Sequence, residues 1–372
     1  MSGFVMFKKL HTIEPYDVTD YQKANYEQID TIRFLTITII VWAHSLFSQW
    51  HVQSSGDLME QIIKAIVVQA GAISTVIFFI VSGILIHSKL QAYNLHLYIN
   101  ERAGSIYFPW IFIVCFNAIL IMLHRIPLLE LWYTRDFDQF ILSIYAIMNG
   151  LLIHGPYWFV VTYFVGMVIL ILFKKYTESN FFGLCLGIIT LFYGLNFYFG
   201  LIDTQHSKAV LAYTFFIWLG FPIHRNWNYL INFVEQLKWK FLIVGLFLMF
   251  CIAVYEGLTL SQSGVNDPFA SNRLSNITFS IIFFVFLLKI GAIRIINNLN
   301  PRKIVFGIYL INSIVVLELS ILLNEYFHEL SFLNIWSLLG LQLIYFLVIL
   351  LITYVIVYAL KKSPLRWMIG VK

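Results

Sequence analysis

Charged residues are scarce in this sequence. Of its 372 residues, 12% are Asp, Glu, Lys or Arg, whereas 60% are hydrophobic. Soluble domains contain about 25% charged and about 45–50% apolar residues. A chain of this composition does not have enough polar side chains to cover its surface in water. The composition therefore excludes a soluble globular domain and predicts an integral membrane protein.

Other absences narrow the class of protein. The three cysteines (Cys115, Cys185 and Cys251) stand apart in apolar runs, which excludes a disulfide framework and favours small apolar side chains. No cluster with metal-ligand spacing, no Pro-rich linker and no repeated, interrupted helices of the kind found in many transporters are present. Residues 1–30 are polar, so we expect no cleavable signal peptide. We expect one membrane domain, no metal site and no nucleic-acid partner.

Long, continuous apolar runs are what the sequence does contain. Each approaches the roughly 20 residues that a helix needs to cross a bilayer. They predict an all-α polytopic protein of about ten spans, at 32–49, 63–86, 104–123, 156–173, 181–200, 209–223, 241–257, 274–290, 304–323 and 335–360. The apolar segment 137–153 is short and is interrupted by Asn149-Gly150. We interpret it as an interfacial or re-entrant helix; the alternative, an additional span, would invert everything after it.

The basic residues orient these spans. With the N-terminus in the cytoplasm, most of the 24 Lys and Arg residues fall in cytoplasmic segments, as the positive-inside rule predicts. The exceptions are Lys64, Arg125, Arg135, Lys208 and Arg273. We therefore expect a cytoplasmic segment at 1–30, a transmembrane domain at 31–362 and a cytoplasmic tail at 363–372.

Ionisable residues inside apolar runs are the candidates for function, because they are costly in lipid. Arg33 and His44 are eleven residues apart in the sequence. In a helix this is a rotation of about 1,100°, close to three full turns, so the two side chains lie on the same face and about 16 Å apart along the axis. The pair predicts a polar cavity that links a cytoplasmic cation to a buried imidazole, the side chain best suited to proton transfer near neutral pH. The alternative is a snorkelling arginine and a histidine satisfied by a neighbouring helix.

Further polar or aromatic residues lie at span ends, and each has a structural alternative. Ser82-Gly83 is typical of close helix packing, and Arg102 at a helix start needs an anionic partner, which lipid phosphate could supply. Tyr157 and Trp158 are typical of the aromatic belt and equally of a sugar-binding surface. The other candidates for contact with a polar substrate are His154, Asp267, Arg273, Tyr309 and Asn312.

Together these segments resemble the acyltransferase family 3 membrane proteins of bacteria. The resemblance runs from about residue 30 to 315 and follows the order of the family's motifs. It is carried by Arg33 and His44; Phe78, Phe79, Ser82 and Gly83; Arg102, Ile106 and Pro109; Trp158 and Phe159; Trp218, Leu219 and Gly220; and Gly307, Tyr309, Leu310 and Ile311. Two positions depart from the family pattern, since Ser105 replaces a second arginine and Asn312 replaces a histidine.

The resemblance implies an enzyme of the bacterial inner membrane that O-acylates surface carbohydrates or their lipid-linked precursors. It implies no permanently bound cofactor and acyl-CoA, usually acetyl-CoA, as cytoplasmic donor. His44 takes the place of the family's essential histidine, acting with Arg33, while Arg33 and Arg102, with Ser82 nearby, hold the donor. His154, Tyr157, Trp158, Asp267, Arg273, Tyr309 and Asn312 then shape the acceptor side.

Other interpretations of the same residues remain open. A transporter or flippase for a glycan or lipid-linked sugar would also use buried His, Arg and Glu. A non-catalytic partner of a polysaccharide synthase is the third, because Asn312 cannot act as a base. Polysaccharide biosynthesis machinery and membrane lipid are the expected partners beyond donor and acceptor.

Overall fold

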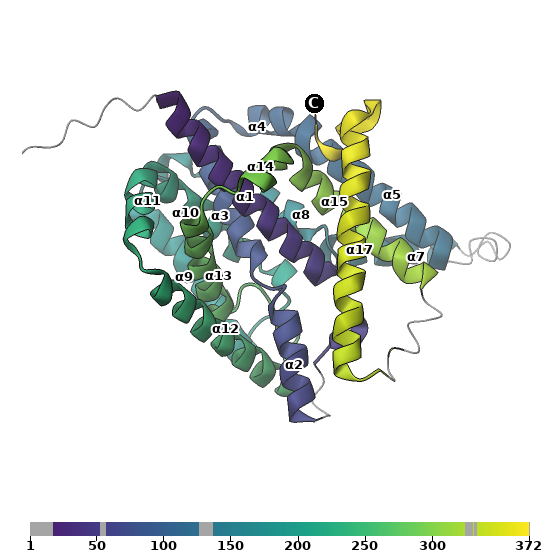
Figure 1. Ribbon diagram of the computed structural model, residues 1–372. Coiled ribbons are helices and arrows are strands. Elements are labelled where there is room, and N and C mark those ends of the chain that lie inside the picture. Colours follow the sequence, from purple (N-terminus) through teal and green to yellow (C-terminus); the bar gives the residue numbers. More distant parts are fainter. Residues whose placement is uncertain (1–17, 53–56, 126–136, 324–329, 331–332, 372) are drawn as a thin grey trace, which may run out of the picture.

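The computed structural model describes residues 18–52, 57–125, 137–323, 330 and 333–371. Every regular element in these residues is a helix, which confirms the all-α class (Figure 1). The helices are α1 Val18–His44, α2 Leu58–Gln69, α3 Ser74–Leu90, α4 Leu95–Arg102, α5 Phe108–Arg125, α7 Phe137–Asn149, α8 Trp158–Leu172, α9 Asn180–Phe199, α10 Val210–Arg225, α11 Trp227–Gln236, α12 Trp239–Gln262, α13 Leu274–Ile290, α14 Arg294–Asn298, α15 Pro301–Leu322 and α17 Ile335–Lys362.

Seven helical stretches among the described residues are long and apolar enough to cross a membrane. They are Leu58–Leu90, Leu95–His124, Phe137–His154, Asn180–Phe199, Trp239–Gln262, Pro301–Leu322 and Ile335–Lys362. Two shorter apolar helices, α8 and α13, add to them. The protein is therefore polytopic. Length and apolar composition of the described helices thus give fewer than the ten predicted spans. The apolar part of α1 adjoins the charged residues Asp30 and Arg33, and α10 has only 16 residues.

The predicted run 63–86 is two helices, because the chain turns between α2 and α3. At this turn Gly71 lies against α1, and a Cβ added to it would be 2.7 Å from the Cβ of Ala43. Only glycine leaves room for so close an approach. The break places the start of α3 beside the helical turn that carries His44.

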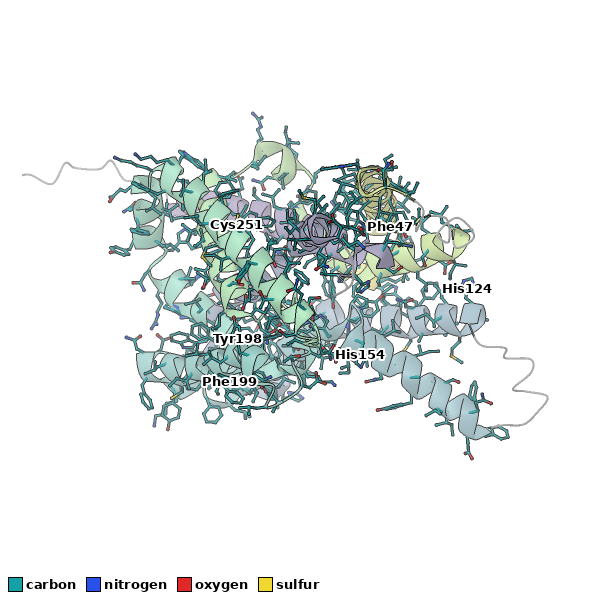
Figure 2. All side chains as sticks on the ribbon, turned by 90° about the horizontal axis from the view of Figure 1, so that it is seen from below. Phe47, His124, His154, Tyr198, Phe199 and Cys251 are labelled. Carbon is teal, nitrogen blue, oxygen red and sulfur yellow. The ribbon has the colours of Figure 1, made fainter. Side chains whose placement is uncertain are left out.

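The segment 137–154 lies at the edge of the helix bundle. Figure 2 looks nearly along α17, whereas the helix that leads to the labelled His154 is seen along its length. It consists of α7 and a π-helical turn, Gly150–His154, and most of it is exposed. Its length and composition would allow it to span. The interfacial interpretation of this segment stays a prediction.

Contacts between loops define two opposite faces. Both ends of the described chain lie at the top of Figure 1. On that face Lys174 Nζ donates to the carbonyl of Tyr93 at 2.8 Å. On the other face the loop 200–209 contacts the loop 263–273 through His206 and Asp267. The common side of the two ends agrees with the prediction, and the assignment of that side to the cytoplasm stays a prediction.

Two glycines hold α3 and α10 together. A Cβ on Gly83 would be 1.9 Å from the carbonyl oxygen of Ile217, and a Cβ on Gly220 would be 2.5 Å from that of Ile80. The backbones therefore touch, as small residues permit in membrane helices. This agrees with the packing interpretation of Ser82-Gly83 and shows why the Trp218-Leu219-Gly220 segment accompanies it.

Candidate active site

A cavity of about 570 Å³ opens on the face opposite the chain ends, and we call it the outer cavity. His44, at the end of α1, lines it. The turn before α3, the start of α8, the loops that carry His206 and Asp267, and the middle of α15 supply the other walls. Figure 2 places His154, another lining residue, where the segment 137–154 reaches the helix bundle.

His44 is held by Asn312 of α15. His44 Nδ1 lies 2.8 Å from Asn312 Oδ1. Asn312 Nδ2 lies 2.8 Å from the carbonyl of Ile308 and 2.6 Å from that of Tyr309. A carbonyl oxygen only accepts hydrogen bonds, so the atom facing both carbonyls must be the amide nitrogen. The amide oxygen then faces His44 and accepts a hydrogen bond from Nδ1–H.

This arrangement fixes the tautomer of the neutral imidazole. With the proton on Nδ1, the unprotonated nitrogen is Nε2, which is the atom that can accept a proton from another group. Asn312 is fully buried and does not line the cavity. Its contribution is thus to orient His44, the role that a carboxylate or amide commonly has beside a catalytic histidine.

A second polar cluster anchors α8 to α15 behind the cavity wall. Tyr157 donates to the carbonyl of Leu310 at 3.1 Å and lies 2.6 Å from Ser313 Oγ. Asn117 Nδ2 donates to the Tyr157 hydroxyl at 3.1 Å. Tyr157 is fully buried, so it positions its neighbours Pro156 and Trp158, which do line the cavity.

His206 and Asp267 form a pair at the rim of the outer cavity. Asp267 Oδ2 accepts from His206 Nδ1 and, at 3.0 Å, from the backbone N–H of His206. Burial disfavours the charged imidazole, but the Asp267 carboxylate outweighs that effect and raises the pKa of His206. Burial also opposes ionisation of Asp267, yet the charge of His206 keeps the pKa of Asp267 below its usual value. Both shifts favour the charged forms of the two side chains.

A cavity of about 290 Å³, the inner cavity, lies toward the face with the chain ends and is lined by three arginines, Arg33, Arg102 and Arg302. Asp30 pairs with two of them, at 2.6 Å from Arg302 Nε and 3.7 Å from Arg33 Nη1. Arg102 Nε is buried without a hydrogen-bond partner in the described part of the chain. Three arginines that line one cavity make it suited to an anion.

The C-terminal segment closes one side of the inner cavity. Ile369, Gly370 and Val371 line it. Gly370 has φ +73°, and a Cβ there would be 2.3 Å from the carbonyl oxygen of Ser105. The segment predicted as a tail is thus part of the cavity wall and packs against the position where the sequence departs from the family arginine.

The two cavities meet at Phe159 and Tyr309, which line both. Their ring centroids are 5.9 Å apart, and the Phe159 ring also packs against Phe79 at 4.5 Å. Arg33 and His44 therefore line two cavities separated by an aromatic constriction, where the sequence had predicted a single continuous cavity. Ile37 of α1 lines the inner cavity and Ile40 the outer one, which shows that the predicted helix face does look into both.

Most of the predicted site residues line one of these cavities. Arg33, Ser82 and Arg102 line the inner one, His44, His154, Trp158 and Asp267 the outer one, and Tyr309 both. Tyr157 and Asn312 lie behind the wall. Arg273 is buried away from both cavities, where it donates to Gln69 at 2.6 Å and lies 3.4 Å from Glu256.

Arg302 and His206 are cavity residues that sequence reasoning missed. Arg302 stands in the first turn of α15, where Asn300-Pro301 marks a helix start, and was counted only as a cytoplasmic charge. His206 lies in a polar loop with no pattern of its own. Its proximity to Asp267 depends on how α9, α10, α12 and α13 pack.

The bundle of apolar helices carries an oriented imidazole in one cavity and clustered arginines in the opposing cavity. This arrangement defines a membrane protein equipped for group transfer. Comparison with known families identifies the class. Residues 26–359 match the family model described as an acyltransferase domain. The chain belongs to the acyltransferase 3 family and is a membrane acyltransferase. Neither the curated proteins nor the solved structures gave a match.

Proposed function

We propose that this protein transfers an acyl group, acetyl in the first instance, from acyl-CoA to a hydroxyl of a surface carbohydrate or its lipid-linked precursor. The donor enters from the cytoplasm and the acceptor from the far side of a bacterial inner membrane. The observation that carries the proposal is the meeting of an arginine-lined cavity and a histidine-lined cavity at Phe159 and Tyr309.

The donor side is supported by charge. Acyl-CoA carries a pyrophosphate, and a guanidinium offers a planar fork of N–H donors that matches phosphate oxygens. Arg33, Arg102 and Arg302 supply three such groups, and Asp30 pairs with Arg33 and Arg302. The acyl thioester lies at the end of a long flexible arm. The distance of about 16 Å along α1 from Arg33 to His44 is within the reach of that arm.

The chemistry follows from the tautomer of His44. Nε2 takes the proton of the acceptor hydroxyl while that oxygen attacks the thioester carbonyl. The carbon–sulfur bond then breaks, and the proton held by His44 passes to the departing thiolate. Asn312 keeps the imidazole in the required tautomer and accepts a hydrogen bond from Nδ1–H throughout.

The acceptor side is supported by the lining of the outer cavity. Trp158 offers an aromatic face of the type that packs on sugar C–H groups, and His154 and Asp267 offer polar groups for hydroxyls. The Trp158 ring lies 4.7 Å from the His206 ring, so the aromatic and polar parts of the wall adjoin. This mixture favours a carbohydrate over a purely apolar acceptor.

The test is acyl transfer by the purified full-length protein in nanodiscs. Release of free CoA from acetyl-CoA should depend on an added oligosaccharide acceptor, and mass spectrometry should find the acetyl ester on the sugar. His44→Gln should lose this activity and remain folded. His124→Gln is the matched control, because His124 lies at the end of α5 outside both cavities (Figure 2).

The other two interpretations give different results in the same assay. A transporter would move the sugar across the membrane without any covalent change. A non-catalytic partner would leave acetyl-CoA intact with every acceptor. Either result with folded wild-type protein would refute the proposal.

A further inference from the structure

A third cavity, of about 540 Å³, lies on the same face as the inner cavity. We call it the polar pocket. It is enclosed by the end of α3, the end of α10, the first turn of α11 and Ile29 of α1. Its lining includes Ser88, His224, Arg225 and Asn226, so hydrogen-bonding groups are concentrated there. None of these residues has a part in the site described above.

The polar pocket adjoins the inner cavity. Leu85 lines both cavities. On α1, Ile29 lines the polar pocket and Arg33 lines the inner cavity, and four residues of helix separate them by about 6 Å along the axis. A ligand held by the arginines could therefore extend past Leu85 into the polar pocket.

The first turn of α11 gives this pocket the character of an anion site. The first N–H groups of a helix have no partners within the helix, and the helix dipole adds partial positive charge there. The ten-residue α11 has no acidic residue in its first turn, and the side chain of Asn226 does not cap it. His224 and Arg225 stand immediately before it; Arg225 pairs with Glu178, which also contacts His87.

A buried donor in the same turn also needs a partner. The Trp227 side chain lines the pocket and is only 7% exposed. Its indole Nε1 has no hydrogen-bond partner among the described residues. An indole N–H is a donor only, so the missing partner must be an acceptor. Leaving a buried donor without an acceptor is unfavourable, which is evidence for an acceptor-rich ligand at this position.

We propose that the polar pocket binds the phosphate-bearing adenosine end of the acyl-CoA donor, with the 3′-phosphate at the first turn of α11. This proposal rests on the proposed function, which makes acyl-CoA the donor. The pyrophosphate then lies at the arginines of the inner cavity, and the thioester points toward Phe159 and Tyr309. A phospholipid headgroup would offer the same phosphate chemistry, and the experiment separates the two sources.

The experiment compares CoA with dephospho-CoA, which lacks only the 3′-phosphate. Full-length protein in phosphatidylcholine nanodiscs is titrated with each by calorimetry, and KM is measured for the two acetylated donors. Wild-type protein should bind CoA about tenfold more tightly, as loss of one charge-assisted phosphate contact predicts. Trp227→Phe, which keeps an aromatic ring but removes the N–H, should reduce this preference.

Tyr229 offers a charge test that does not threaten the fold. It is the third residue of α11, is 77% exposed and lines the pocket. Tyr229→Glu places a carboxylate where the helix dipole favours it, so the helix remains stable while a bound phosphate is repelled. This variant should bind CoA and dephospho-CoA equally. Tyr229→Gln, the neutral control, should keep the wild-type preference.

Each outcome separates the pocket from the proposed function. If the wild type binds CoA and dephospho-CoA equally and has equal KM values for the two acetylated donors, with acyl transfer intact, the ligand proposed for the polar pocket is wrong. The proposed acyltransferase function is then unaffected. If the wild type binds CoA selectively but transfers no acyl group from either donor, the ligand proposed for the polar pocket is supported and the proposed acyltransferase function is refuted. If the pocket holds a lipid phosphate, the wild type will bind CoA and dephospho-CoA equally and Tyr229→Glu will lower the anionic phospholipid retained on purification, and that result also overturns the proposal.

Discussion

His44 Nδ1 donates to Asn312 Oδ1 over 2.8 Å, and the amide of Asn312 is locked by two backbone carbonyls of its own helix. The residue that departs from the family pattern is therefore compatible with an active histidine. An asparagine cannot act as a base, but it can hold the tautomer in which Nε2 is free to do so.

Replacing Asn312 should slow catalysis without weakening donor binding. Asn312→Leu removes the acceptor for Nδ1–H, so the imidazole loses its fixed orientation and tautomer. We expect kcat to fall by about tenfold or more, with KM for acetyl-CoA unchanged. The pH profile of kcat should also shift, which a purely structural role would not cause. Leu322→Ala, on the same helix but exposed and outside both cavities, is the control. A raised KM with unchanged kcat would contradict the assigned role.

Removing Arg302 should impair donor binding. Arg302→Met leaves two arginines in the inner cavity and frees Asp30 from its contact at 2.6 Å, so the cavity becomes less positive. We expect KM for acetyl-CoA to rise by about tenfold while kcat stays similar, because a charge-assisted phosphate contact is lost. Arg294→Met removes an exposed charge of α14 that does not line the cavity, and should leave KM unchanged. Equal effects of the two changes would mean that only the overall surface charge matters.

The contact between α3 and α10 should not tolerate a methyl group. Gly83→Ala puts a Cβ 1.9 Å from the carbonyl oxygen of Ile217, so the helices must separate. We expect a loss of about 1–3 kcal/mol, the range for overpacking a close contact. Thermal unfolding in detergent measures it. Gly340→Ala is matched in chemistry and adds its Cβ to open space, so it should be close to neutral. Equal unfolding midpoints for both variants would show that α3 and α10 have room to move apart.

The His206–Asp267 pair should make stability depend on pH. The pKa of His206 is raised, so its contribution is complete below the unfolded value of about 6.5 and is lost as pH rises through the folded value. The pKa of Asp267 is lowered, so its contribution is complete above about 3.9 and is lost as pH falls through the folded value. The pair stabilises the two loops most between these limits.

His206→Gln should therefore lower the unfolding midpoint more at pH 5.5 than at pH 9. Because both side chains are partly exposed, we expect about 1 kcal/mol at most. His51→Gln is the control on the same face, since His51 Nδ1 lies 2.8 Å from the Ser48 carbonyl and the ring has no acidic partner among the described residues. A difference that does not change with pH would show that the pair is not ionised.

Much of the site was predictable because it lies on single helices. Arg33 and His44 are placed on one face by helical period alone, and the structure puts that face against both cavities. Ser82 and Arg102 were predicted beside Arg33 and do line the same cavity. Composition and apolar run length similarly gave the all-α membrane class, since these depend only on how much apolar surface each segment carries.

The features of the site that could not be predicted from the sequence depend on contacts between segments that are distant in the chain. Arg273 was a plausible substrate contact from its loop position, yet α2 and α12 enclose it through Gln69 and Glu256. The aromatic constriction is likewise a product of packing, because Phe159 and Tyr309 come from α8 and α15.

The amino-acid order by itself determined that this chain is a helical membrane protein with an arginine and a histidine on one stripe of its first span, because hydropathy and helical period are local properties. Tertiary structure alone decided that the stripe faces two cavities instead of one, that Arg302 joins the inner cavity and that Asn312 orients His44. Those outcomes depend on which helix faces meet and how closely, and side-chain volume at the contacts between helices sets that distance.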